Sequence, residues 1–223
     1  MKEYKACVVV QGKVNINCIK LIKQAFSGYQ LIHSCWEGDD GSLFDESDIV
    51  VVNEIPAESG AGNFYLQRGS TIAGMKKAIE LGWNRALKWR SDMWCKDGDK
   101  LFQKFDSDSL NLYFWANHLD GYITDFFMEG KCSEIITLFD TELPQYKYNY
   151  PEFGITFQFF RNGLDKKCRF MGHTLDRECD IYWPKNKLWF SRHQRDAWFV
   201  SEVPITADEW IPKRRGKPIN LFE

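Results

Sequence analysis

The sequence predicts an α/β fold in which a mixed, mostly parallel sheet is flanked by helices. Residues 6–10 and 48–52 are short apolar runs rich in valine, which is typical of strands buried on both faces of a parallel sheet. Between them, apolar residues recur at helical spacing over residues 18–26, and a further short strand follows at residues 31–34. This strand–helix–strand order favours parallel neighbours joined by a crossover.

We expect the whole chain, residues 1–223, to form one domain. Its length and a hydrophobic content of 44% suit a single large domain with a sizeable core. Residues 1–92 carry the parallel pattern, whereas residues 93–223 predict a mixed half that ends in an irregular wrap. A formal net charge of −2 gives no overall attraction to nucleic acid or to an anionic membrane, so we expect no nucleic-acid partner.

The cysteine pattern and the N-terminal residues indicate a reducing compartment. The seven cysteines are an odd number without a C-x-x-C pair, and no spacing resembles a structural zinc site. The apolar run at residues 6–10 is too short for a signal peptide, and no uninterrupted apolar stretch is long enough to cross a membrane. We therefore expect a cytoplasmic protein with free thiols and no transmembrane segment.

Two helices are predicted in the first half of the chain. The first has Asn15 or Asn17 as its N-cap and Gly28 as its stop. The irregular stretch 53–69 follows the third strand, and loops of this length are uncommon unless they are functional. We expect the second helix to open at Ser70. Its predicted apolar stripe, at spacings of three and four, consists of Ile72, Met75, Ile79 and Trp83.

A short strand at residues 86–90 ends in Ser91 and Asp92. A carboxylate directly after a parallel strand lies at the carboxyl edge of the sheet, where ligands of α/β proteins bind. The alternative interpretation is an ordinary strand capped by a turn-forming Ser-Asp pair.

The second half predicts an antiparallel pair of strands and several helices. The strands at residues 110–116 and 122–127 are joined by a short polar connection, which favours the antiparallel arrangement. Beyond them, we expect an irregular wrap with short strands at 189–190 and 197–200 and a solvated basic end at 213–217. The predicted helices are 101–105, 133–139 and 151–160.

Several short motifs occur in a fixed order over about residues 6–130. They are VVVQG at 8–12, SCWEG at 34–38, QRGSTIAG at 67–74, KWRSD at 88–92 and TDFFM at 124–128. This series resembles the WavE-type lipopolysaccharide-synthesis proteins, a glycosyltransferase family. Compact enzymes of this kind are also similar to the capsid-decorating glycosyltransferases of large DNA viruses. The resemblance implies a GT-A-like (Rossmann-like) fold, with residues 1–92 as the nucleotide-sugar-binding half and the remainder as the acceptor half.

The activity that the resemblance implies is transfer of a sugar from a nucleotide-diphosphate donor, a UDP-sugar first of all, to a hydroxyl of a glycan or glycoprotein. Such enzymes use a D-x-D motif to hold Mn²⁺ or Mg²⁺ at the donor diphosphate. Here the motif reads Arg90-Ser91-Asp92, so the first carboxylate is replaced by a cation. By this resemblance Asp92 is the metal ligand, because oxygen ligands suit both ions, and Ser91 and Arg90 contact ribose or phosphate. A rival motif at residues 106–108 (Asp-Ser-Asp) precedes a strand, which favours a solvated turn.

The resemblance also implies donor contacts elsewhere. Val10, Gln11 and Gly12 would pass under the nucleotide base, and Asn53 would lie nearby at a strand end. Arg68, close to a predicted helix N-terminus, would approach the diphosphate, because such termini attract anions. The alternative for Arg68 is a solvated side chain.

Base catalysis of the transfer requires a carboxylate that accepts the proton of the acceptor hydroxyl. Asp125 is the first candidate, with Glu129 second, and the alternative for Asp125 is a strand-end cap. His173 or His193 would supply a late metal ligand, although a lone histidine is more often structural.

Two other classes of function compete with glycosyl transfer. A nucleotidyltransferase acting on sugar phosphates shares a nucleotide-binding α/β half, but it usually has a glycine-rich basic loop after the first strand. Residues 11–13 (Gln-Gly-Lys) are a poor version of that loop. A non-catalytic carbohydrate-binding protein is the other alternative, because nine tryptophans and nine tyrosines suit sugar stacking.

Overall fold

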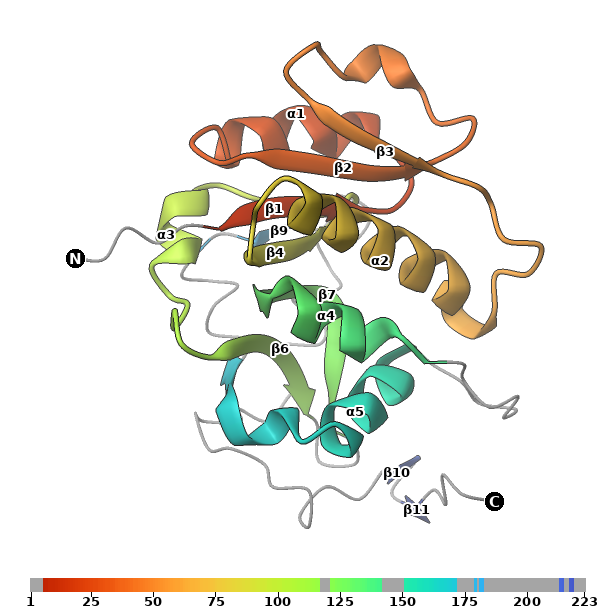
Figure 1. Ribbon diagram of the computed structural model, residues 1–223, viewed down its shortest axis with the longest axis vertical. Helices are drawn as coiled ribbons and strands as arrows, with labels where there is room; N and C mark the ends of the chain where they lie inside the picture. The colour runs from red at the N-terminus through yellow and green to blue at the C-terminus, as the bar shows by residue number, and fades with distance from the viewer. Residues whose placement is uncertain are drawn as a thin grey trace.

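A seven-stranded mixed sheet forms the centre of the molecule (Figure 1), with the strand order β3-β2-β1-β4-β7-β6-β8. A computed structural model of the chain describes residues 6–116, 121–141, 151–171, 179, 181–182, 213–214 and 217–218. The strands of this sheet are β1 (Cys7–Gln11), β2 (Leu31–Trp36), β3 (Ile49–Asn53), β4 (Arg85–Arg90), β6 (Leu110–Ala116), β7 (Gly121–Lys131) and β8 (Cys168–Met171). β1 to β4 are parallel, β7 is antiparallel to both of its neighbours, and β8 is parallel to β6. The predicted α/β class with a mixed, mostly parallel sheet is therefore confirmed.

Helices cover both faces of the sheet and enclose two apolar cores. One core packs α2 (Phe64–Glu80), α4 (Cys132–Phe139) and α5 (Pro151–Arg161) on one face; Figure 1 shows these three helices on the same side of the sheet. The other core packs α1 (Ile16–Ala25) and α3 (Gly98–Phe102) on the opposite face. Short elements complete the described chain: η1 (Gly41–Leu43), η2 (Ala61–Asn63), β5 (Trp94–Cys95), η3 (Leu164–Lys167), β9 (Ile181–Tyr182), β10 (Lys213–Arg214) and β11 (Lys217–Pro218).

The first helix follows its local capping signals. The side chain of Asn15 accepts a hydrogen bond from the backbone N–H of Asn17 at 3.0 Å, so Asn15 is the N-cap of α1. The helix ends at Ala25, three residues before the predicted stop at Gly28.

The second helix begins earlier than predicted, and its buried face matches the prediction in part. It begins at Phe64, so the predicted N-cap Ser70 lies inside the helix. There the Ser70 hydroxyl donates to the Leu66 carbonyl at 2.8 Å. The helix ends at Glu80, before Trp83. Of the predicted stripe, Met75 is buried and Ile72 and Trp83 pack against the core, whereas Ile79 is 47% exposed. The buried face also includes Gly74, where a Cβ would collide with Val9. Close approach of the helix to β1 therefore sets which face is buried.

The second half contains the predicted antiparallel pair, in which β6 pairs with β7. The predicted helix at 101–105 instead spans residues 98–102, because Asp97 caps it by accepting from the Lys100 N–H at 2.9 Å. Within the basic segment 213–217, Lys213 and Arg214 form β10, which pairs with β11. β8 was not predicted, and the expected strands at 189–190 and 197–200 lie outside the described residues.

All seven cysteines are free thiols, as predicted. Among the described residues, none of the helices combines the length and the apolar character needed to cross a bilayer.

Candidate active site

The carboxyl ends of β1 and β4 are tied together at one edge of the sheet. Gly12 follows β1 with a φ of +113°, a conformation that favours glycine, and its N–H donates to the Ser34 carbonyl at 3.0 Å. The Ser91 hydroxyl donates to the Lys13 carbonyl at 2.6 Å, and a Cβ on Gly12 would lie 3.0 Å from that hydroxyl oxygen. Ser91, predicted to contact the donor, therefore also fixes the backbone that leaves β1.

Gln11 and Asn53 differ in how their polar atoms are used. The Asn53 amide donates to the Cys35 carbonyl at 2.7 Å and to the Ser34 hydroxyl at 3.0 Å, so it ties β3 to β2. The Gln11 amide donates to the Ser70 hydroxyl at 2.9 Å, while its buried Oε1 accepts no hydrogen bond within the described part of the chain. That oxygen is an acceptor which a ligand N–H can satisfy.

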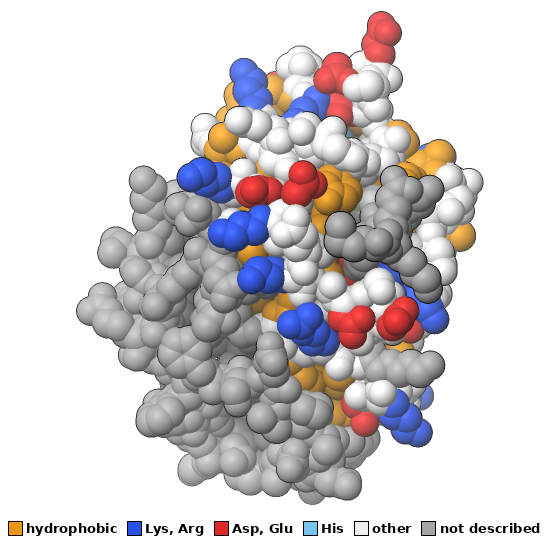
Figure 2. Space-filling view, turned by 90° about the vertical axis from the view of Figure 1, so that its left-hand side faces the viewer, with side chains coloured by type: hydrophobic (Ala, Val, Ile, Leu, Met, Phe, Trp, Pro, Cys, Tyr) orange, Lys and Arg blue, Asp and Glu red, His pale blue; other side chains and the backbone are white. Residues whose placement is uncertain are grey.

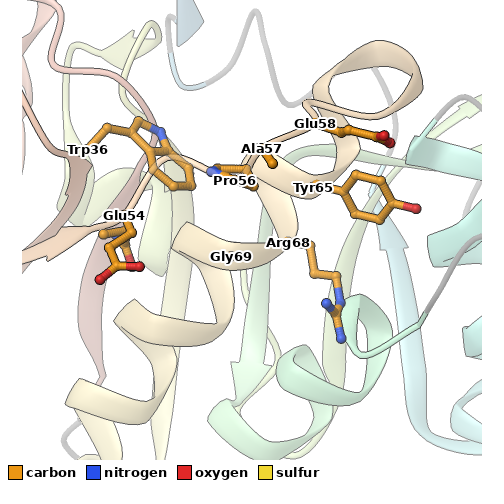
Figure 3. Close-up of a pocket in the computed structure, with 9 residues that line it drawn as sticks. Trp36, Glu54, Pro56, Ala57, Glu58, Tyr65, Arg68 and Gly69 are labelled. Atoms are coloured by element: carbon orange, nitrogen blue, oxygen red, sulfur yellow. The ribbon is translucent and has the colours of Figure 1, made fainter.

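A pocket of about 530 Å³ opens at the same edge, beyond β2 and β3. It is lined by Trp36, Asn53, Glu54, Pro56, Ala57, Glu58, Tyr65, Arg68 and Gly69. Figure 3 shows Trp36 and Glu54 on one side of this pocket and Tyr65, Glu58 and Arg68 on the other. The volume is in the range of small-molecule sites, and the lining combines aromatic rings with a few charged groups, as such sites do.

Arg68 lies in the second turn of α2, not in a loop before the helix. Its Nε donates to the Phe139 carbonyl at 3.2 Å, and its Nη2 forms an ion pair with Asp140 at 3.1 Å. The side chain therefore satisfies the carboxyl end of α4 while also lining the pocket, and it is not simply solvated.

At the carboxyl end of β4, Arg90 contacts two carboxylates. Its Nε and Nη2 donate to the two oxygens of Asp92 at 2.9 and 2.8 Å, and its Nη1 lies 3.3 Å from Asp125 Oδ2. Its guanidinium also lies 5.4 Å from the centre of the Phe126 ring. Burial acts to lower the pKa of Arg90, but Asp125 and Asp92 outweigh it and raise the pKa above its ordinary value. Arg90 is therefore a fixed cation at this edge.

Lys88 is a second cation of the same cluster and is completely buried. Its ammonium donates to the backbone carbonyl of Asp125 and lies 5.5 Å from the centre of the Phe139 ring. Burial lowers the pKa of Lys88 to about 8, with Asp125 acting in the opposite direction. The ammonium thus orients the strand backbone that carries Asp125.

Glu152, in the first turn of α5, is the third carboxyl group of this cluster, which we define as Lys88, Arg90, Asp92, Asp125 and Glu152. Burial raises the pKa of Glu152 to about 7, and the neighbouring Asp125 carboxylate adds to the rise. A carboxyl group with this pKa exchanges a proton near neutral pH, which suits acid–base catalysis.

The side chains at Asp92 do not fit a divalent metal ion as they stand. Both oxygens of Asp92 accept hydrogen bonds from Arg90, so a metal at Asp92 would have to break that pair and lie beside a second cation. The described residues also contain no group of three or more His, Cys, Asp or Glu side chains arranged to hold a metal. His173 and His193 lie outside the described residues, and the predicted Mn²⁺ or Mg²⁺ site stays a prediction.

The other two acidic candidates lie away from this edge. Glu129 is fully buried and pairs with Arg85 at 2.8 Å, at the beginning of β4, while the Asn111 amide donates to it at 2.6 Å. Asp106 accepts from the Asp108 N–H at 3.0 Å, which is the turn expected for the rival motif. Neither group is near the Arg90 end of β4, so we do not carry Glu129 forward as a catalytic base.

The described surface carries charges of both signs. Figure 2 shows acidic and basic side chains interspersed over the described part of one face of the molecule. No patch of a single charge sign covers the described part of that face.

Lys88 and Glu152 had not been predicted as site residues. One indication for Lys88 was present in the sequence, because a charged residue at an inward position of an otherwise apolar strand requires a partner. Glu152 follows a proline at a helix start, where acidic residues are common, so nothing local distinguished it. Its position beside β7 depends on tertiary packing.

A scan of the sequence against models of known protein families finds no match, and a search among curated proteins finds none either. The functional assignment of this chain therefore depends on the geometry of its own side chains.

Proposed function

We propose that this chain is a glycosyltransferase of the GT-A type that moves a sugar from a nucleotide-diphosphate donor to a hydroxyl of a glycan or glycoprotein. One observation carries the proposal: a pocket of about 530 Å³ and the charged cluster around Arg90 lie at the same carboxyl edge of the mixed sheet. The strand order, with β7 antiparallel beside β4, supports a GT-A arrangement.

The pocket supports binding of a nucleoside. Trp36 lines the pocket with 8% of the residue exposed, so a base would pack against the exposed part of its ring, and the carboxylates of Glu54 and Glu58 suit ribose hydroxyls. A UDP-sugar is the first donor to test, because the resemblance of the motifs favours uridine.

In the proposed reaction, the bond between the anomeric carbon and the diphosphate breaks, and its electron pair leaves on the diphosphate. Arg90 supplies a fixed positive charge near this point, which stabilises the charge that develops on the leaving group. Bound Mn²⁺ or Mg²⁺ would supply the same neutralisation, but the side chains at Asp92 do not fit it, and no step is assigned to a metal.

Thermal unfolding with UDP, UDP-glucose, UDP-galactose, UDP-N-acetylglucosamine, GDP-mannose and TDP-glucose tests donor binding, each with Mn²⁺ or with EDTA. A ligand at 100 times its Kd stabilises the native state by about 2.7 kcal/mol. For a chain of this size, that corresponds to a rise in Tm of roughly 5–11 °C.

The matched variants Trp36→Leu and Trp83→Leu test whether the nucleotide binds in the pocket that Trp36 lines. Trp36→Leu should remove most of the stabilisation, whereas Trp83→Leu, at the opposite edge beside Cys132, should retain it. Stabilisation by a free glycan but by no nucleotide would favour the carbohydrate-binding alternative over the proposed function.

A further inference from the structure

The three carboxyl groups of the cluster differ in what they can reach. The Asp125 side chain is only 2% exposed, and Arg90 Nη1 lies 3.3 and 3.5 Å from its oxygens. Asp92 is more exposed, but both of its oxygens are bonded to Arg90. Glu152 is partly exposed, and no side chain in the described ranges forms an ion pair or hydrogen bond with its carboxylate. Among the described residues, Glu152 is therefore the carboxyl group of the cluster that Arg90 does not engage.

The position of Glu152 is fixed from two sides. The Thr156 hydroxyl donates to the Glu152 carbonyl at 2.7 Å and accepts from the Ile123 N–H of β7 at 3.0 Å, two residues before Asp125. At the start of α5, the ring of Pro151 packs against Gly62 so closely that a Cβ on Gly62 would lie 2.8 Å from it. The first turn of α5 is thus held between η2 and the strand that carries Asp125.

The charges around Glu152 suit a group that exchanges a proton. Asp125 raises the pKa of Glu152, whereas Arg90 and Lys88 lower it. Asp92 accepts hydrogen bonds from the Arg90 guanidinium. The cluster contains one more carboxyl group than cations. A proton on one carboxyl group balances the charges of the cluster. Glu152, which is partly exposed and is not bonded to Arg90, is the member that can exchange this proton with a substrate.

We propose that Glu152 is the catalytic base of the transfer and that Asp125 is a positioning residue, which holds Arg90 in place. This inference rests on the proposed function. The Glu152 carboxylate takes the proton of the acceptor hydroxyl as the acceptor oxygen bonds to the anomeric carbon. The bond to the diphosphate breaks on the opposite side, and the diphosphate leaves with the electron pair. A single displacement of this kind inverts the anomeric configuration.

The test compares the wild-type chain with Glu152→Gln, Glu152→Asp, Asp125→Asn and the surface control Glu80→Gln. Release of UDP from UDP-glucose, UDP-galactose and UDP-N-acetylglucosamine, with water as the acceptor, is measured across pH 5–9, beside the shift in Tm caused by UDP. We expect Glu152→Gln to keep the UDP-induced shift in Tm and to lose at least roughly 100-fold in rate. The wild-type rate should rise with pH through about 7, the profile should flatten in Glu152→Gln, and Glu152→Asp should restore it in part.

Four results separate the possible failures. Unchanged turnover in Glu152→Gln, or loss of the pH dependence in Asp125→Asn but not in Glu152→Gln, would overturn the base assignment and leave the proposed function standing. Retention of the anomeric configuration in the released sugar, measured by NMR, would also overturn it. Absence of nucleoside-diphosphate release by the wild-type chain from these three donors and from GDP-mannose and TDP-glucose would remove the proposed function, and the base assignment with it.

Discussion

Replacement of Glu152 by glutamine should change how the stability of the protein depends on pH. Glutamine keeps the size and polarity of the protonated side chain but cannot ionise. The folded protein holds the Glu152 proton up to a pKa of about 7, whereas the unfolded chain releases it near 4.5. Between these values the folded state binds more protons than the unfolded state, so this group lowers the free energy of unfolding as pH rises.

The magnitude follows from the two pKa values. A difference of one pKa unit corresponds to about 1.36 kcal/mol, so the interval from 4.5 to about 7 corresponds to about 3 kcal/mol. Relative to wild type, Glu152→Gln should therefore become more stable by up to about 3 kcal/mol as pH rises from 4.5 to 8. His33, whose pKa burial lowers to about 4, gives the opposite slope, but it is present in both proteins and cancels in the difference.

Urea unfolding at half-unit pH intervals from 4.5 to 8 measures this difference, with Glu80→Gln as the matched control. Glu80 lies at the exposed end of α2, paired with Lys77 at 3.0 Å, so its variant should follow wild type closely. A difference between wild type and Glu152→Gln that stays constant with pH, or that changes with the opposite sign, would refute the reasoning about this carboxyl group.

Two further predictions concern stability. Arg90→Ala leaves a buried carboxylate without its cation and should lower the free energy of unfolding in urea by about 3–5 kcal/mol. Arg68→Ala removes a largely exposed ion pair and should lower it by about 1 kcal/mol or less. Equal losses in the two variants would contradict the assigned role of Arg90. Gly74→Ala forces a methyl group against Val9 and should lower the free energy of unfolding by about 1–3 kcal/mol. The control Gly28→Ala, with open space around the new methyl group, should leave it nearly unchanged. A stabilised Gly74→Ala would show that α2 does not need its close approach to β1.

The sequence predicted the elements that depend on local signals. The apolar runs that became β1 and β3, and the Asn15 cap of α1, need only neighbouring residues to be recognised. The start of α2 was missed because Ser70 can cap a helix or bond inside one, and the choice depends on the packing of the preceding turn. The prediction that Ile79 is buried failed because the close contact at Gly74 turns that face towards solvent.

The candidate site was predictable only in part. The Arg90-Ser91-Asp92 segment was placed at the carboxyl edge from its position after a strand, and Asp125 was named as a candidate base without its contact with Arg90. The pairing of Arg90 with both carboxylates, and the approach of Glu152 from another helix, arise from contacts between residues far apart in the chain. Composition and periodicity carry no information on such contacts.

The most direct test of the central claim is turnover of a nucleotide sugar by the wild-type chain. Purified protein incubated with UDP-glucose, UDP-galactose and UDP-N-acetylglucosamine should release UDP from at least one of them, and Trp36→Leu should weaken or abolish that release. Absence of UDP release from every donor, with and without Mn²⁺, would contradict the proposal that this chain is a glycosyltransferase.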